Sequence, residues 1–262
     1  MFKALRNLLL LSCCMLQGCP HPDTASASKT EPVSKKPDLI KAATYNVQLG
    51  LGYLKQGDRP RAKKKLLLAL DQAPGSPDVN AAIAYYFEQT SELDQAKKYY
   101  LKAVTLSANS GAQLNNYGTF LCRQGDYQKA ETYFLKAVKD LHYLNTSGAY
   151  ENAGLCSLAI PDKDKAKHYF GAALGQDPSR KQSLYELVLL ESKAGNDGEA
   201  LKQLEKHPDL VLNDPAFLEL AKDLANKTGN ATLAAQYETN FRNMGSNTDN
   251  SGEKNEYNNH NG

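Results

Sequence analysis

The sequence predicts an all-α fold, a right-handed superhelix of six helix–turn–helix repeats, from three observations. First, alanines recur at a nearly constant interval, with steps of 34, 34, 36, 34 and 34 residues. They are Ala62, Ala96, Ala130, Ala166, Ala200 and Ala234. Second, turn residues and large apolar residues keep fixed offsets inside each interval. Third, 41% of the 262 residues are hydrophobic, enough for a continuous core between stacked repeats.

The interval divides the chain into six units. They span residues 43–76, 77–110, 111–146, 147–180, 181–214 and 215–244. In the third unit, Gly118 and Ala130 are the small residues at the eighth and twentieth positions, where two antiparallel helices approach closely. Gly125-Asp126 turns the chain between these helices. Such offsets are typical of the tetratricopeptide repeat. An irregular helical bundle with accidental periodicity is the alternative.

The later units depart from this pattern. Pro161 takes the place of the turn glycine in the fourth unit, and Asn145 is expected to cap that unit's first helix. In the fifth unit, His207-Pro208 lies where the second helix should be ending, which predicts a shortened helix. Terminal units of a solenoid are commonly atypical because one side faces water.

The first residues predict export and anchoring. Residues 1–18 join a short basic region to an apolar run that is too short to span a bilayer, the layout of a signal peptide. Residues 16–19, Leu-Gln-Gly-Cys, resemble the lipobox of bacterial lipoproteins. This resemblance implies that Cys19 becomes an N-terminus acylated by chains such as palmitate, and Pro20 in place of Asp implies sorting to the outer membrane. An ordinary cleaved signal with an incidental cysteine is the alternative.

Two polar segments flank the repeats. Residues 19–42 are mostly small, polar and rich in proline, so we expect a lipidated flexible tether that lets the folded part stand off the membrane. Residues 245–262 are rich in Asn, Ser and Gly and lack an apolar period, which predicts a disordered polar tail. Acyl chains on Cys19 would hold the protein durably to a leaflet.

Charge and motif spacing argue against two functional classes. Lys and Arg total 31 and Asp and Glu total 29, and Lys3 and Arg6 of the signal segment account for the excess. A neutral mature chain lacks the basic surface of a nucleic-acid binder. The five histidines are dispersed, and no metal-ligand, phosphate-loop or nucleophile-elbow motif is present. We therefore expect no enzyme, cofactor, metal or small-molecule substrate, with a periplasmic enzyme of unrecognised site as the alternative.

The first helix of each pair is expected to line the concave face with positions 2, 5, 9, 12 and 13 of its unit. The candidate partner-binding residues at these positions are Val47, Leu51, Leu54, Tyr85, Glu88, Asn115, Thr119, Arg123 and Leu155. Such a groove is apolar at its start and mixed in its middle, which suits an extended or helical peptide. Leu51 and Leu54 are the strongest candidates because apolar residues exposed in a groove need a partner. Asn115 and Arg123 are suited to peptide backbone or a carboxylate.

Cys122 and Cys156 fall on the first helices of neighbouring units. These helices are expected to run parallel within packing distance, and a periplasmic location permits oxidation. A disulfide requires Cα atoms about 4.4–6.8 Å apart. Both a bridge and two separate buried thiols are consistent with the sequence.

Two strings, Asn115 to Cys122 (NNYGTFLC) and Tyr150 to Cys156 (YENAGLC), resemble those of the PilF/PilW lipoproteins of type IV pilus biogenesis. The resemblance extends over the lipobox, the six units and the cysteine pair. It implies a pilotin, an outer-membrane lipoprotein on the periplasmic face that helps the pilus secretin reach that membrane and assemble, with the secretin as its partner. A tetratricopeptide scaffold lipoprotein of outer-membrane barrel assembly or of peptidoglycan enzymes is the alternative in the same class.

Overall fold

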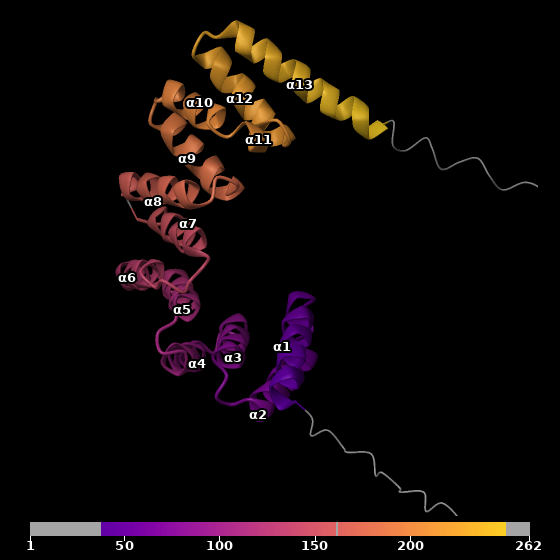
Figure 1. Ribbon diagram of the computed structural model, residues 1–262, viewed down its shortest axis with the longest axis vertical. Coiled ribbons are helices and arrows are strands. Elements are labelled where there is room, and N and C mark those ends of the chain that lie inside the picture. The colour runs from indigo at the N-terminus through magenta and orange to yellow at the C-terminus, as the bar shows by residue number, and fades with distance from the viewer. Residues whose placement is uncertain (1–37, 161, 250–262) are drawn as a thin grey trace, which may run out of the picture. The chain divides into compact units, whose positions relative to one another are not determined.

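The computed structural model describes residues 38–160 and 162–249, and within these ranges the chain forms thirteen α-helices and no strand (Figure 1). The predicted all-α class is thereby confirmed. The signal segment 1–18 and the acylation site Cys19 lie outside the described residues, as do most of the predicted tether and the end of the predicted tail. None of the helices in the described ranges is both long and apolar enough to cross a bilayer.

Twelve of the helices pair into six consecutive hairpins, one for each predicted unit. The first three hairpins are α1 (Leu39–Lys55) with α2 (Arg59–Gln72), α3 (Pro77–Gln89) with α4 (Leu93–Leu106), and α5 (Gly111–Arg123) with α6 (Tyr127–Val138). The last three are α7 (Thr146–Ser157) with α8 (Lys163–Gln176), α9 (Lys181–Lys193) with α10 (Asp197–Glu205), and α12 (Pro215–Lys227) with α13 (Ala231–Asp249). From α1 to α9, each first helix also contacts the first helix of the next unit, so the hairpins stack into a helical tetratricopeptide superhelix (Figure 1).

The small residues that define the repeat lie between paired helices. All six recurring alanines are buried. At the eighth position, a Cβ added to Gly118 would lie 2.9 Å from the ring of Phe134, and one added to Gly154 would lie 2.7 Å from the ring of Phe170. At these two positions the helices can approach this closely only because glycine has no side chain. The repeat spacing therefore marks the places where paired helices are in closest contact.

The turns inside the hairpins use the left-handed backbone conformation. Four units place a glycine there, with φ between 75° and 81°. These are Gly57, Gly125, Gly195 and Gly229. In the second unit the same position is Ser91, with a φ of 63°, and in the fourth it is Pro161, which lies outside the described residues. Ser91 therefore adopts a conformation that glycine accepts at lower energy.

Both ends of the repeat array extend further than the spacing predicted. Helix α1 begins at Leu39, inside the expected tether, because the Asp38 side chain accepts a hydrogen bond from the Lys41 amide at 3.0 Å and caps the helix. Helix α13 continues to Asp249, five residues into the expected disordered tail. Extending an existing helix adds one backbone hydrogen bond for each residue that is fixed, so the loss of an apolar period does not end it at once.

Two local predictions of helix structure are confirmed. Asn145 caps α7 by accepting a hydrogen bond from the Gly148 amide at 3.2 Å. Helix α10 has only nine residues and ends before His207-Pro208, as expected. The chain then forms a short extra helix, α11 (Pro208–Val211), which was not predicted and which places Val211 in the core.

Candidate functional site

A groove of about 480 Å³ lies between the first helices of the first four units. Its lining residues are Val47, Leu51, Asp78, Ala81, Ala82, Tyr85, Tyr100, Asn115, Asn116, Thr119, Arg123 and Asn152. Helices α1 and α3 contribute its apolar part, whereas α5 and α7 contribute mainly amide side chains. Six of the nine predicted partner-binding residues line it, namely Val47, Leu51, Tyr85, Asn115, Thr119 and Arg123.

The other three predicted residues lie elsewhere. Leu54 is partly buried against the core around Ala62 and Leu66, as Val47 and Leu51 are, but unlike them it does not line the groove. Glu88 is buried beneath Arg123 rather than presented to the groove. Leu155 is exposed on α7 but does not line this groove. A prediction made one helix at a time could not place these side chains, because their burial depends on the neighbouring helices.

Sequence reasoning also missed groove residues at one recurring position. Ala82, Asn116 and Asn152 each stand sixth in their unit. Positions 2, 5, 6 and 9 have the spacing i, i+3, i+4 and i+7, which is one continuous face of an α-helix. The sixth position therefore lies on the same helix face as the predicted positions 2, 5 and 9, and the spacing could have identified it. Tyr100 carried no such signal, since it reaches the groove from the second helix of its unit.

A buried ion pair fixes the polar end of the groove. The Arg123 guanidinium donates to the two carboxylate oxygens of Glu88 at 2.5 and 2.8 Å, and the Tyr100 hydroxyl donates to Glu88 Oε2 at 2.9 Å. The Glu88 side chain is only 6% exposed, whereas that of Arg123 is 43% exposed. The hydrogen bond to Glu88 raises the pKa of Arg123. Burial and then the Glu88 charge raise the pKa of Tyr100 well above its usual range, so its hydroxyl remains a donor.

This arrangement corrects the expectation that Arg123 could receive a client carboxylate. Its Nε and Nη2 groups already donate to Glu88, and the Glu88 carboxylate compensates the positive charge of the guanidinium. Removing one partner from such a pair leaves an uncompensated charge near the core. The geometry therefore favours an uncharged ligand at this end of the groove.

Amide side chains connect three first helices across the groove. Gln113 Nε2 donates to Asp78 Oδ1 at 2.8 Å, Asn116 Nδ2 donates to Gln113 Oε1 at 3.3 Å, and Asn152 Nδ2 donates to Asn115 Oδ1 at 3.0 Å. Asn115 Nδ2 and Asn152 Oδ1 have no hydrogen-bond partner among the described residues. One donor and one acceptor are thus available to a peptide backbone, which carries both groups at every residue except proline.

Known proteins share this repeat and its arrangement. A tetratricopeptide repeat family model matches residues 47–112. The type IV pilus assembly protein PilF of Pseudomonas aeruginosa is 35% identical over 167 residues, which cover 64% of this chain and 64% of that protein, just under two thirds of its length. A solved structure of Pseudomonas aeruginosa PilF has a TM-score of 0.62 at 28% identity and covers 80% of this chain and 100% of that one. The chain belongs to the PilF/PilW-like family of tetratricopeptide-repeat proteins.

A second solved structure supports the same assignment. The crystal structure of PilW, described as a widely conserved type IV pilus biogenesis factor, has a TM-score of 0.59 at 27% identity and covers 75% of this chain and 90% of that one. The superhelix of this PilF/PilW-like chain is therefore the tetratricopeptide arrangement found in solved members of the family.

The cysteine pair of this PilF/PilW-like chain forms a disulfide. Cys122 on α5 and Cys156 on α7 are bonded, with their Cα atoms 5.8 Å apart. The structure thus has the bridge rather than the two separate thiols that the sequence also allowed. The bond joins the first helices of the third and fourth units, both of which line the groove.

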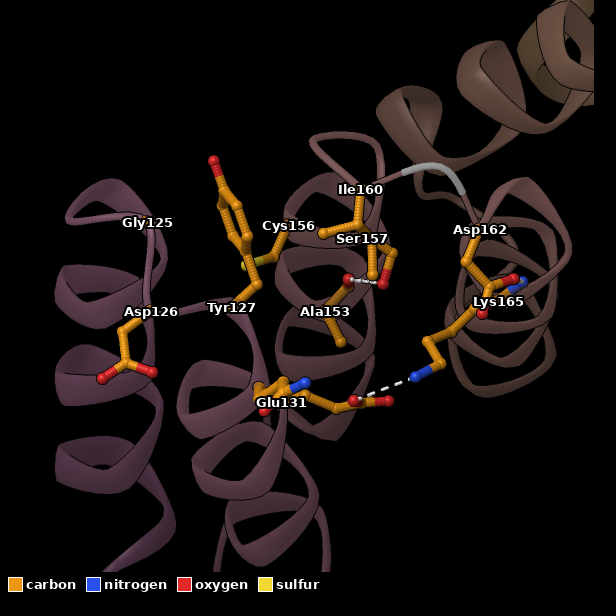
Figure 2. A pocket seen from close by; sticks show the side chains of 11 residues that line it. Gly125, Asp126, Tyr127, Glu131, Ala153, Cys156, Ser157, Ile160, Asp162 and Lys165 are labelled. Carbon is orange, nitrogen blue, oxygen red and sulfur yellow. Dashed lines mark hydrogen bonds and ion pairs between the residues drawn. The ribbon is translucent and has the colours of Figure 1, made fainter.

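A second cleft of about 510 Å³ lies beside α6, α7 and the start of α8, and Figure 2 shows its lining. Lys165 Nζ lies 3.1 Å from Glu131 Oε2, and the Tyr169 hydroxyl also donates to Glu131. Burial and then this hydrogen bond raise the pKa of Tyr169. The Glu131 carboxylate of this cleft thus already has two partners, Lys165 and Tyr169. Within the described residues, no three His, Cys, Asp or Glu side chains are placed to hold a metal ion.

Proposed function

We propose that this chain acts in type IV pilus biogenesis as an outer-membrane lipoprotein, a pilotin that binds a segment of the pilus secretin in the α1–α7 groove. Family membership supports the biological setting, since PilF is named as a pilus assembly protein and PilW as a pilus biogenesis factor. The lipobox-like residues 16–19 support anchoring through Cys19. The groove itself is the observation that carries the binding role.

The chemistry of the groove suggests the kind of segment that it accepts. Val47, Leu51 and Tyr85 offer apolar contacts along one side, and Asn115 and Asn152 offer backbone hydrogen bonds along the other. The Glu88–Arg123 pair compensates the charge at its end. Asp78 adds a carboxylate to the lining whose hydrogen-bond partner among the described residues is the neutral Gln113 amide. We therefore infer a client segment without net negative charge, held by a few apolar side chains and by its backbone.

The anchor and the groove together give a mechanism that requires no chemical reaction. Acylated Cys19 would hold the repeats at the inner leaflet of the outer membrane, and the groove would hold the client beside the same membrane. Because the client is then tethered beside the membrane, the effective concentration of the client at its site of membrane insertion is raised. The rigidity of stacked hairpins preserves the groove while this occurs.

Deletion of the gene tests the biological role. We expect the secretin to remain largely monomeric, as seen by the loss of its detergent-resistant multimers in immunoblots of membrane fractions, and surface pili to disappear. A Cys19→Ser variant should lower both multimers and pili by displacing the groove from the membrane. Unchanged multimers and pili in the deletion strain would contradict the pilotin role.

Secretin capture by groove variants tests the binding site. Tyr85 lines the groove and is 38% exposed, so Tyr85→Ser should weaken capture about tenfold or more, the usual effect of removing an aromatic anchor. The same change at Tyr45, which is 56% exposed on α1 but does not line the groove, is the matched control and should leave capture unchanged. Equal capture by both variants would mean that the client binds elsewhere.

A further inference from the structure

Positive charge is concentrated on the second helix of the chain. Residues 59–72, which form α2, include five cations and one carboxylate. By contrast, residues 197–227, near the other end of the repeat array, contain four cations and seven carboxylates. A chain that is almost neutral as a whole is therefore strongly polarised along its length, with its positive end in the first hairpin.

The cations of α2 lie on its solvent side. Arg59, Arg61, Lys63 and Lys64 are all exposed. Lys64 lies opposite the stripe formed by the buried Ala62, Leu66 and Ala69, and Arg61 and Lys63 lie on its two flanks. Arg59 is the first residue of the helix and stands in line with that stripe, one turn before Ala62. Of these four, only Arg61 has an ion-pair partner among the described residues, the N-cap carboxylate of Asp58. The other three charges have no such partner in the described part of the chain, so they are candidates for contact with an anionic surface.

Two leucines extend the same exposed side by one helical turn. Leu67 and Leu68 are 44% and 41% exposed. Adjacent cations and exposed leucines on one helix are the combination found in helices that lie at a membrane surface, where the cations meet phosphate groups and the apolar side chains enter the headgroup region.

We propose that the exposed side of α2, formed by Arg59, Arg61, Lys63, Lys64 and the two leucines, docks on the anionic phospholipid surface of a bilayer. Charge complementarity supports this occupant, and so does the place of α2 in the hairpin that follows the segment between the expected anchor and the first repeat. The cations spread over the outside of one helix, which suits a continuous layer of phosphates. Docking would direct the first hairpin toward the membrane and the acidic units away from it.

This inference is independent of the pilotin role, because it requires a bilayer and no client. Vesicle sedimentation tests it with the full chain carrying Cys19→Ser, so that no acyl chain contributes. Vesicles of phosphatidylglycerol are compared with vesicles of phosphatidylcholine, which report the background from the apolar run of residues 1–18. The cations Lys3 and Arg6 of that segment are present in every variant, so their contribution cancels when the variants below are compared. We expect tighter binding to phosphatidylglycerol, and loss of that preference in 0.5 M salt, where charges are screened beyond about 4 Å.

Charge-removal variants locate the binding surface. Each cation near an anionic surface contributes roughly fivefold to the partition coefficient, so Arg59→Gln, Lys63→Gln and Lys64→Gln combined should lower it by about 100-fold. The matched control removes the same charge from exposed positions of the fifth unit, with Lys193→Gln, Lys202→Gln and Lys206→Gln, and should retain phosphatidylglycerol binding. Circular dichroism and thermal unfolding of each variant check that the helices are intact.

Three outcomes would overturn the proposal. Equal binding of the Cys19→Ser chain to both vesicle types would show that no anionic surface is recognised. Equal loss in the two triple variants would show a response to net charge alone. Undiminished binding by the α2 variant would place the membrane contact elsewhere. If the α2 cations bind an acidic protein and the chain shows no preference between the vesicles, that protein is the occupant instead of the bilayer.

Discussion

Replacing Gly118 with alanine tests the close packing on which the repeat depends. Gly118 lies on α5 and faces Phe134 of α6. A Cβ there would lie 2.9 Å from two carbon atoms of the Phe134 ring and 3.2 Å from the carbonyl oxygen of Ala130. Phe134 is only 1% exposed and has no open space into which to turn. The two helices must therefore separate, or the ring must leave its rotamer.

The size of the effect follows from two opposing terms. Overpacking a close-packed core by one methyl group costs about 1–3 kcal/mol. Glycine to alanine in a helix interior returns about 1 kcal/mol through helix propensity. Gly171 on α8 isolates the second term, because a Cβ at this exposed position meets nothing within 4 Å. Gly171→Ala should stabilise the protein by about 1 kcal/mol, and Gly118→Ala should be about 2 kcal/mol less stable than Gly171→Ala.

Urea unfolding followed by far-UV circular dichroism measures this difference. With a slope of about 2 kcal/mol per molar urea, the two midpoints should differ by about 1 M. Adding Phe134→Leu to Gly118→Ala should restore part of the loss, as a favourable coupling in a double-mutant cycle. If Gly118→Ala stabilises the protein as much as Gly171→Ala, then close helix approach does not explain glycine at the eighth position, and the physical basis assigned to the repeat is wrong.

Three further predictions follow from the turn, the disulfide and the buried tyrosine. Ser91→Gly should raise the free energy of unfolding by about 0.5 kcal/mol, because relief of a positive φ outweighs the entropy of glycine; a lower thermal midpoint would contradict this. Reducing the Cys122–Cys156 bond, which closes a loop across a sequence separation of 34, should lower the free energy of unfolding by about 3–4 kcal/mol in urea titrations with and without reductant, and a double Cys→Ser variant should not respond to reductant. Burial raises the pKa of Tyr100, so its contribution to stability is complete below the unfolded value near 10 and is lost as the pH rises toward its folded pKa. Between pH 9 and 12, the unfolding free energy of Tyr100→Phe should therefore fall less steeply than that of the unsubstituted chain, and parallel curves would contradict the assigned shift.

The number and order of the hairpins were predictable because each unit repeats one steric requirement. A small residue must stand where two helices cross, and this requirement recurs at a fixed interval whatever the rest of the unit contains. The ends of the array have no such requirement. Helix α1 begins at Leu39 because of the local cap at Asp38, and α13 continues to Asp249 by propagation. Local backbone energetics set these boundaries, and the spacing of core residues carries no information about them.

The groove was predicted in part for a related reason. Helical periodicity correctly placed Val47, Leu51 and Tyr85 on the lining face, since direction on a single helix depends only on position. Leu54 and Glu88 were placed wrongly because their exposure depends on side chains from other helices. Periodicity gives the direction of a side chain, whereas its availability to a partner depends on tertiary neighbours.

Some of those neighbours nevertheless follow the repeat. Asp78 with Gln113 joins position 2 of one unit to position 3 of the next, and Glu88 with Arg123 joins positions 12 and 13. Asn115 with Asn152 joins positions 5 and 6. In these three pairs a polar residue finds its partner one position later in the following unit. The Glu151–Ser183 hydrogen bond and the Cys122–Cys156 disulfide join other positions, so the offset describes these groove contacts and not every contact between first helices. At positions 5 and 6 between the first two units, the same offset brings together only apolar side chains. The polar residues in these pairs stabilise the stack. The apolar lining near α1 and α3 remains for a client, together with the amide groups of Asn115 and Asn152 that have no hydrogen-bond partner among the described residues.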